Sequence, residues 1–202
     1  MSRQLQRRLW AYNHGNRRVE SGSRSAKILQ TLYPYNRKTS AYLGSSTKIT
    51  RSRLKKRGLL TQDEDGAYSL TDLGRWFAIS SMLNLSFLQL CALACACCTH
   101  QRYASAKKTG FYMRSTFEGI FKEYYSKRYI TWIFATLKRD GYAEKFAKRM
   151  IRIKPEVCAG LMSRYGEQFK RLESWLDSLE EKELEILAKA LDGFEPTEEQ
   201  TD

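Results

Sequence analysis

The stretch of chain with the most residues able to do metal or redox chemistry is the apolar segment 82–98. Its candidate ligands are Cys95, Cys97, Cys98 and, just beyond it, His100. Zinc sites usually combine two pairs of closely spaced ligands, and no second C-x-x-C pair exists in this sequence. Free cysteine is also among the most frequently buried residue types. The segment therefore predicts core packing, with Cys91 and Cys95 on one helical face, and we expect no metal and no other cofactor.

No combination of residues in the sequence is typical of an active site. The two histidines, His14 and His100, lie in unrelated segments, and the sequence has no G-x-x-x-x-G-K-S/T, H-E-x-x-H or G-x-S-x-G motif. Tyr124 and Tyr125 lie in a basic region but lack the partners that a tyrosine nucleophile needs. We therefore expect a protein that is not an enzyme and has no catalytic residues.

Charge is segregated along the 202-residue chain, whose formal net charge is +13. Residues 1–57 hold 15 Lys and Arg against one acid, and residues 100–154 hold 14 against four. Residues 155–202 reverse this balance, with 13 acids against five bases. Two strongly basic blocks indicate a polyanionic partner. We expect double-stranded DNA, with RNA as the alternative.

The cysteine content predicts a reducing compartment, and the localisation that we expect is cytoplasmic, in the prokaryotic cytoplasm or nucleoid. The five cysteines are an odd number, and four of them share one apolar segment, which is not typical of a disulfide framework. That segment is short for a membrane span and contains Asn84, Ser86 and Gln89. We therefore expect no membrane partner.

The first 80 residues predict a flexible basic arm followed by a small helical unit. The arm covers 1–22, and the expected helices run from a cap at Ser23 or Ser25 to Pro34, over 39–43, and over 47–57 with Ser45 or Ser46 as cap. The periodicity then changes and predicts strands over 59–61 and 67–70 around a turn at 63–66. Thr71 is expected to cap a further helix over 72–77.

This order of elements, together with the pattern L-x-x-x-G-L-L, turn, L-T-x-x-G, resembles the winged helix-turn-helix superfamily, in particular regulators of the MarR and PadR kind. The pattern lies in residues 53–60 and 70–74, and the resemblance covers about residues 23–80. It implies that the third helix enters a DNA major groove and that the wing tip contacts the backbone or the minor groove.

The sequence departs from this family in the third helix. Thr47 and Arg51 stand eleven and seven residues before Gly58, where family members usually have apolar residues. The third helix is therefore either weakly anchored or shifted by a residue or two from the expected register.

A shift of 83 residues superposes a second copy of the pattern on the first. Residues 54–59 then align with 137–142, and residues 70–72 align with 153–155. Three apolar residues precede Gly141 with the spacing of one helical face, namely Ile130, Phe134 and Leu137. A second wing is expected from strands over 142–146 and 150–154 with its tip at 147–149, before a helix that begins at Pro155.

The expected fold class is mainly α with small β-hairpin wings, arranged as tandem winged helix-turn-helix units plus C-terminal helices. The expected divisions are the arm (1–22), a first unit (23–80), a second unit (81–160) that includes a buried linking helix (81–99), and C-terminal helices with an acidic tail (161–202). The C-terminal region has an apolar stripe at Phe169, Leu172 and Leu176. The stripe fits either a homodimer interface or packing on the chain's own core, and both interpretations stay open.

The expected function is sequence-specific binding of double-stranded DNA by a transcriptional regulator, for example of a mobile element. The alternatives are a replication or partition protein of a plasmid or phage, and a non-catalytic nucleic-acid-binding subunit of a larger nucleoprotein complex. The family pattern places DNA contacts on both third helices and on the second wing. They are Ser46, Thr47, Lys48, Thr50, Arg51, Arg53 and Lys55 in the first unit, and Lys127, Arg128, Tyr129, Thr131, Trp132, Lys148 and Arg149 in the second. The denser charge of the first unit predicts that it supplies most of the affinity.

Overall fold

A computed structural model of the chain describes residues 22–35, 38, 40–103, 127–147 and 150–177. This part of the chain is mainly helical and contains two small antiparallel strand pairs, as the sequence predicts. It divides into two compact units. The N-terminal unit comprises the described residues up to Phe87, and the C-terminal unit comprises those from Leu88 onward. The expected arm, apart from Gly22, and the expected acidic tail lie outside the described residues.

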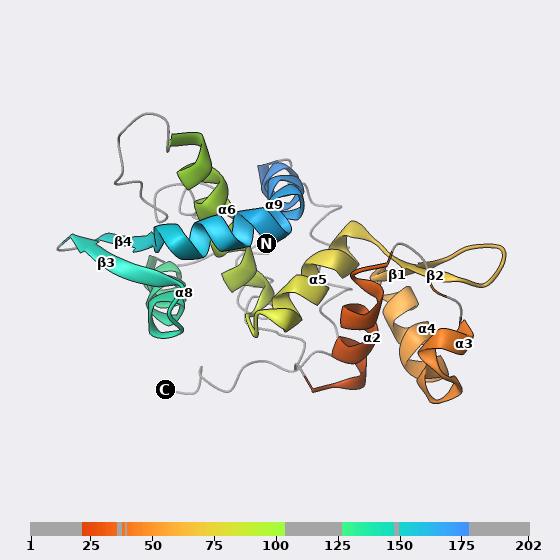
Figure 1. Ribbon diagram of the computed structural model, residues 1–202. Helices are drawn as coiled ribbons and strands as arrows, with labels where there is room; N and C mark the ends of the chain where they lie inside the picture. The colour runs from red at the N-terminus through yellow and green to blue at the C-terminus, as the bar shows by residue number, and fades with distance from the viewer. Residues whose placement is uncertain (1–21, 36–37, 39, 104–126, 148–149, 178–202) are drawn as a thin grey trace, which may run out of the picture. The chain divides into compact units, whose positions relative to one another are not determined.

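The N-terminal unit has the order of helices and strands that the sequence predicts (Figure 1). Its elements are α2 (Arg24–Leu32), α3 (Ser40–Leu43), the 3-10 turn η1 (Ser45–Thr47), α4 (Lys48–Lys56), β1 (Leu60–Gln62), β2 (Tyr68–Leu70) and α5 (Asp72–Met82). Two predicted caps are confirmed. Ser23 Oγ accepts a hydrogen bond from the Ala26 amide at 3.1 Å, and Thr71 Oγ1 accepts one from the Gly74 amide at 3.0 Å. Each cap satisfies an amide that the helix itself leaves unpaired.

Two boundaries near α4 differ from the prediction. Ser45 and Ser46 do not cap this helix, because they belong to η1 and Thr47 takes the cap position without a side-chain cap bond. The first strand begins at Leu60, one residue later than expected. The Leu59 amide instead donates to the Leu54 carbonyl at 3.0 Å and closes the end of α4.

The expected helix over 81–99 is corrected at its start. The chain ends α5 at Met82 and begins α6 (Phe87–Tyr103) five residues later. Asn84, in the break, has a positive φ of 53°, a conformation that asparagine tolerates better than most residues. The Ser80 hydroxyl donates to the Leu85 carbonyl at 2.6 Å, and the Leu85 amide donates to the Ser80 carbonyl at 2.9 Å. These bonds satisfy the end of α5 and allow the chain to turn before α6.

A tight junction connects α4, the hairpin and α5. Gly58 ends α4 with a positive φ of 72°, and the Thr71 hydroxyl donates to the Gly58 carbonyl at 2.7 Å. The Thr71 amide donates to the Leu59 carbonyl at 3.2 Å. Gly74 lies against the same carbonyl, so closely that a side chain at this position would overlap the Leu59 backbone. The L-T-x-x-G pattern therefore has a local physical reason: threonine bonds the turn, and glycine allows the helix to approach it.

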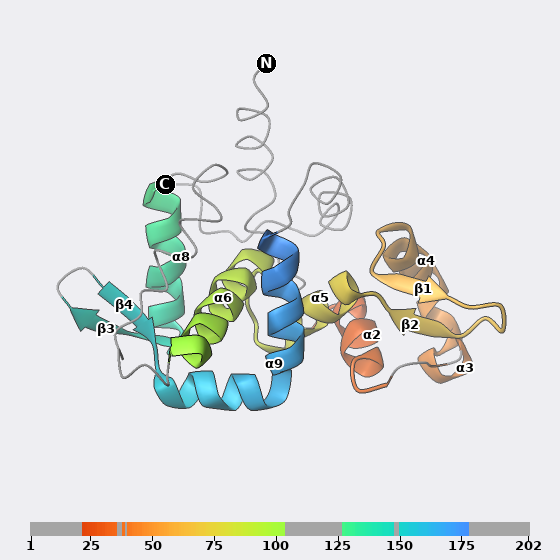
Figure 2. The ribbon, with the colours of Figure 1, turned by 90° about the horizontal axis from the view of Figure 1, so that it is seen from above.

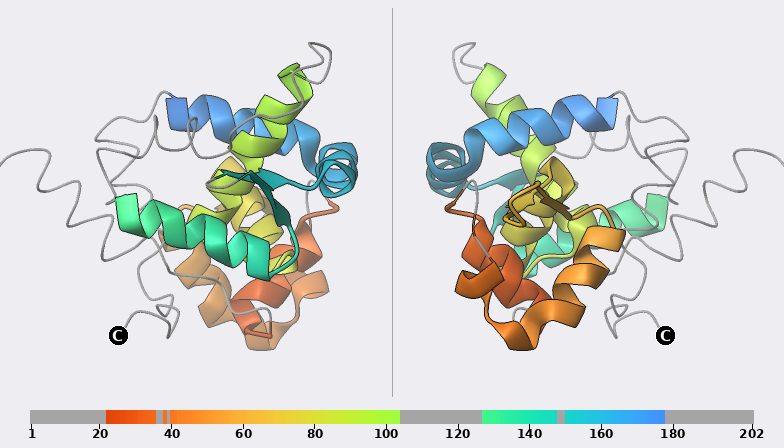
Figure 3. Two further views of the ribbon diagram at one scale, coloured as in Figure 1. Left: turned by 90° about the vertical axis from the view of Figure 1, so that its left-hand side faces the viewer. Right: turned by 90° about the vertical axis from the view of Figure 1, so that its right-hand side faces the viewer.

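The described part of the C-terminal unit consists of three helices and one hairpin. Its elements are α6, α8 (Lys127–Arg139), β3 (Ala143–Ala147), β4 (Met150–Ile153) and α9 (Pro155–Asp177). The expected boundary at residue 160 falls inside α9. Figure 2 shows that α9 bends sharply between two helical arms, and that α6 lies between α8 and α9. The left view of Figure 3 shows the end of α8, drawn in green, leading into the strand pair.

The two units repeat the same local structure at a constant offset of 83 residues. Leu60 pairs with Leu70 in the first hairpin, and Ala143 pairs with Ile153 in the second. Gly141 repeats the positive φ of Gly58, at 84°. The bond from the Thr71 amide to the Leu59 carbonyl recurs between Lys154 and Tyr142, also at 3.2 Å. The internal repeat that the sequence predicts is therefore present in the backbone hydrogen bonds as well as in the residue types.

The core of the C-terminal unit is built around α6, which is buried on all sides from Leu88 to Thr99. A helix that is apolar all round fits only in the middle of a unit. Gln89 Nε2 donates to the buried Thr136 hydroxyl of α8 at 2.8 Å. From α9, the described stripe residues Phe169, Leu172 and Leu176 are buried in this core. A homodimer, which stays a prediction, would have to use other residues.

We expect Gly74→Ala to lower the free energy of unfolding by about 1–3 kcal/mol, because the new methyl group has to displace the Leu59 backbone. Gly160→Ala is the matched control, since nothing lies within 4 Å of its added Cβ. Alanine is the better helix former, so this control should gain up to about 1 kcal/mol. Urea unfolding of both variants measures the difference, and equal changes would contradict the role of Gly74.

Candidate nucleic-acid interface

The outward face of α4 is basic. Among its exposed residues are Lys48, Arg53, Lys55 and Lys56, and the helix contains no acid. Lys55 Nζ donates to Gln62 Oε1 of β1 at 3.0 Å, which directs Lys55 toward the hairpin. Helical geometry places Lys48, Arg53 and Lys56 around the side of α4 opposite its buried residue Leu54. We call Lys48, Ile49, Ser52, Arg53 and Lys56 the α4 face.

Arg51 does not belong to the α4 face, although the sequence suggested a DNA contact. It is only 5% exposed, and its guanidinium carbon lies 5.2 Å from the centre of the Tyr68 ring. Arg51 and Leu54 are the buried residues of this helix. The structure thus turns Arg51 inward, at a position where the sequence pattern led us to expect an apolar residue. A guanidinium can do this because its stem packs like a hydrocarbon and its plane stacks on an aromatic ring.

Thr47, another predicted DNA contact, instead forms hydrogen bonds within the turn before α4. Its hydroxyl lies 2.9 Å from the Leu43 carbonyl and 2.8 Å from the Gly44 carbonyl, and donates to them. Gly44 has a positive φ of 79°, which permits the sharp change of direction between α3 and α4. Thr47 thus fixes the approach of α4. Of the other predicted contacts, Ser46 is exposed and Thr50 is half-buried.

The tip of the β1–β2 hairpin is acidic. Asp63, Glu64 and Asp65 are exposed there, and Asp63 Oδ1 accepts from the Ala67 amide at 2.8 Å. Carboxylates at this tip would be repelled by phosphates. The expected contact between the first wing and a DNA backbone is therefore disfavoured by charge.

A second group of cation–ring contacts, around Lys38, connects β2 of the strand pair to α3. Lys38 Nζ lies 3.7 Å from the centre of the Tyr35 ring and 4.1 Å from that of Tyr42. The Lys38 amide donates to the Tyr68 carbonyl at 3.0 Å, and the Tyr68 amide donates back at 2.8 Å. Tyr68 therefore links this group to Arg51 of α4. The pKa of the exposed Tyr42 hydroxyl is raised, mainly by the neighbouring Tyr35.

In the equivalent helix of the C-terminal unit, α8, the side chains described, from Thr131 onward, form a less basic face. Thr131, Ala135, Lys138 and Arg139 are exposed, and Trp132 is half-buried. Arg139 Nε forms a 3.0 Å ion pair with Asp140 Oδ1, which lowers the charge at this end. The predicted residues Lys127, Arg128 and Tyr129 lie in the first turn of α8, where only the backbone is described. The predicted wing contacts Lys148 and Arg149 lie outside the described residues.

Three residues of the α4 face were missed by sequence reasoning, namely Ile49, Ser52 and Lys56. Their spacing of three and four residues was the available signal, because it places them on one side of a helix.

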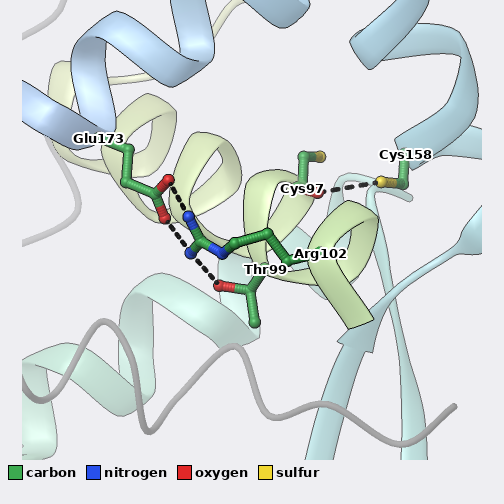
Figure 4. A network of polar contacts seen from close by, with 5 residues as sticks. All are labelled: Cys97, Thr99, Arg102, Cys158 and Glu173. Atoms are coloured by element: carbon green, nitrogen blue, oxygen red, sulfur yellow. Dashed lines mark hydrogen bonds and ion pairs between the residues drawn. The ribbon is translucent and has the colours of Figure 1, made fainter. Parts of the chain in front are cut away.

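The cysteine cluster lies in the core of the C-terminal unit, as its apolar setting predicts. All four cysteines of α6 are buried, and so is Cys158 of α9. The Cys158 thiol donates to the Cys97 carbonyl at 3.7 Å (Figure 4). No group of three or more potential ligands in the described residues is arranged to hold a metal ion. Burial raises the pKa of the Cys91 and Cys95 thiols, and it raises that of Cys98 to about 12. Thiols that stay protonated are poor nucleophiles.

A buried carboxylate ties the end of α6 to α9 beside these thiols. Glu173 is 6% exposed and accepts two hydrogen bonds of 2.6 Å from the Arg102 guanidinium. Figure 4 shows this guanidinium between Glu173 and Thr99, whose hydroxyl it reaches at 3.4 Å. A carboxylate is tolerated at this depth because a bidentate cation pairs with it. The cluster is a structural centre of the unit.

Comparison with protein-family models, with curated proteins and with solved structures found no match to this chain. Among the described residues, no single helix is both long enough and apolar enough to cross a membrane. The one pair of helices that passes this test jointly, α5 with α6, is broken between Met82 and Phe87.

We expect Arg51→Ala to lower the free energy of unfolding by about 1–3 kcal/mol, because it removes a buried stem and the contact with Tyr68. Arg53→Ala, two residues away on the exposed side, should change stability by less than about 0.5 kcal/mol. Urea unfolding of the two variants gives the comparison. Equal stability of both would mean that Arg51 is not an anchor of α4.

The thiol pKa values predict a loss of stability in alkali. Burial raises the pKa of the Cys98 thiol from about 9 to about 12, so the unfolded chain loses this proton at a lower pH than the folded chain does. The contribution of the protonated Cys98 thiol to the free energy of unfolding is therefore fully present below about pH 9. It is lost as the pH rises toward about 12. The wild-type chain should therefore lose about 1.4 kcal/mol more than Cys98→Ser between pH 8 and pH 10. Urea unfolding at both pH values measures this, and equal losses would refute the assignment.

Proposed function

We propose that the chain is a tandem winged-helix protein that binds double-stranded DNA and uses α4 as its main recognition helix. The observation that supports this best is the α4 face, which presents Lys48, Arg53 and Lys56 on a helix without a single acid. Like charges that repel one another along one helix face are stabilised when they meet a polyanion. A DNA major groove is wide enough to admit an α-helix and has phosphates along both edges.

The position of Lys48 supports an anionic partner. A cation in the first turn of a helix faces the positive end of the helix dipole and costs about 0.3–1 kcal/mol. No acid in the first turn of α4 compensates for Lys48. Basic residues in the last turn, by contrast, stabilise a helix without any ligand, so Arg53 and Lys56 alone would be weaker support. A phosphate beside Lys48 would turn this local penalty into an attraction.

The geometry before α4 also supports the proposal. The Gly44 turn and the Thr47 hydroxyl bonds hold α3 and α4 as a compact pair of helices. Arg51 and Leu54 anchor α4 on its inner side and leave the α4 face free of core contacts. The acidic tip of the first hairpin argues that this wing stays away from phosphates. The unit would then bind through the helix rather than through the wing.

The proposal is tested by selecting sequences bound by the full chain from random duplex DNA, then measuring affinity against salt. If the basic faces engage roughly 6–10 phosphates, affinity falls by about 10³–10⁵ between about 50 and 200 mM salt. The double variant Arg53→Ala, Lys56→Ala should reduce the slope of log K against log salt by about 1.8, since two phosphate contacts are lost.

The matched control is the double variant Lys138→Ala, Arg139→Ala, which removes the same charge from the equivalent helix α8. It should cost clearly less affinity than the α4 variant. Equal losses, or the reverse order, would reject α4 as the main recognition helix. Failure to enrich any motif from random duplexes would reject sequence-specific binding and favour a subunit that holds nucleic acid without sequence preference.

A further inference from the structure

The most exposed large apolar side chain among the described residues lies in the middle of the α4 face. Ile49 is 69% exposed, although it stands on a helix whose inner side is well packed. Lys48, Arg53 and Lys56 surround it on the same face. Isoleucine is also a weaker helix former than alanine or lysine, so it gives α4 no local advantage. Its exposure leaves Ile49 available for a contact outside the unit.

The surroundings of Ile49 restrict the chemistry of that contact. A matching surface needs one apolar group set among negative charges. On the edges of the bases in a DNA major groove, the 5-methyl group of thymine is the apolar group, and phosphates lie on both sides. RNA fits less well, because the major groove of an A-form helix is too narrow for side chains to enter.

We propose that Ile49 contacts the 5-methyl group of a thymine and thereby selects a T·A pair at one position of the bound site. This inference rests on the proposed function and adds the base that α4 selects. Helical spacing places Ser52 three residues and Lys56 seven residues further along the same side. The small hydroxyl of Ser52 leaves room for the isoleucine to reach the groove floor. Lys48 and Arg53 flank Ile49 on this face, so they would meet the phosphates along the two edges of the groove.

The test uses deoxyuridine, which pairs like thymidine but lacks the methyl group. Duplexes selected by the full wild-type chain are resynthesised with deoxyuridine at each thymine in turn, and affinity is measured at constant salt. At one or two positions the wild-type affinity should fall about fourfold, because this is the change in affinity expected when the burial of one methyl-sized group is lost. Ile49→Ala should bind the thymine and deoxyuridine duplexes equally well at these positions.

Met82→Ala is the matched control, because it removes another exposed apolar side chain of the same unit, on α5. It should keep the wild-type preference for thymine. Urea unfolding of Ile49→Ala checks that the exposed substitution leaves the fold intact.

Three results would overturn the inference. If deoxyuridine never weakens wild-type binding to an enriched motif, Ile49 does not contact a thymine, while the proposed function stands. If Ile49→Ala keeps the full deoxyuridine penalty, another residue makes the contact. If the wild-type chain enriches no duplex motif at all, the proposed function fails and this inference fails with it.

Discussion

The fold of both units depends on one backbone junction, in which a helix ends at a glycine with positive φ and the next strand begins at once. At Gly58, the Gly58 amide donates to the Lys55 carbonyl and the Leu59 amide donates to the Leu54 carbonyl, both at 3.0 Å. These bonds satisfy carbonyls that the end of a helix leaves unpaired. The Leu59 carbonyl then accepts from the start of α5, so helix, strand and following helix are fixed together. The same bonds recur at Gly141.

Local signals of this kind explain why much of the fold could be predicted from the sequence. Ser23 and Thr71 as caps, the glycines Gly58 and Gly141, and Pro155 as the first residue of α9 each act within a few residues of their own position. Boundaries that composition does not mark were less predictable. The break at Asn84 is one example, because residues 82–98 have the composition of a single helix, although the bonds between Ser80 and Leu85 end α5 there.

The candidate site was predicted less well, because its key residue depends on a partner distant in sequence. Arg51 stands seven residues before Gly58, at an inward position of the expected register, but its charge in a basic helix favoured the surface. Its position is set by the Tyr68 ring, which β2 brings under α4, and Lys38 pairs with the backbone of that tyrosine. The family pattern placed Arg51 among the DNA contacts, and its burial follows only from the three-dimensional fold. Ile49 was not among the predicted contacts, although helical spacing puts it on the side opposite Leu54.

The two copies of the scaffold differ in what their helices are used for. In the described part of the chain, the four exposed large apolar residues, Tyr35, Tyr42, Ile49 and Met82, all belong to the N-terminal unit. In the C-terminal unit, α6 is buried along most of its length and the bent α9 packs its apolar stripe inward. Gly74, which lets α5 approach the Leu59 carbonyl, is matched there by Val157, so the two junctions are not packed alike. A buried cluster of thiols and the buried Glu173 carboxylate tolerate few substitutions, whereas an exposed basic face can change without loss of the core. This contrast favours the N-terminal unit for recognition and the C-terminal unit for a stable core.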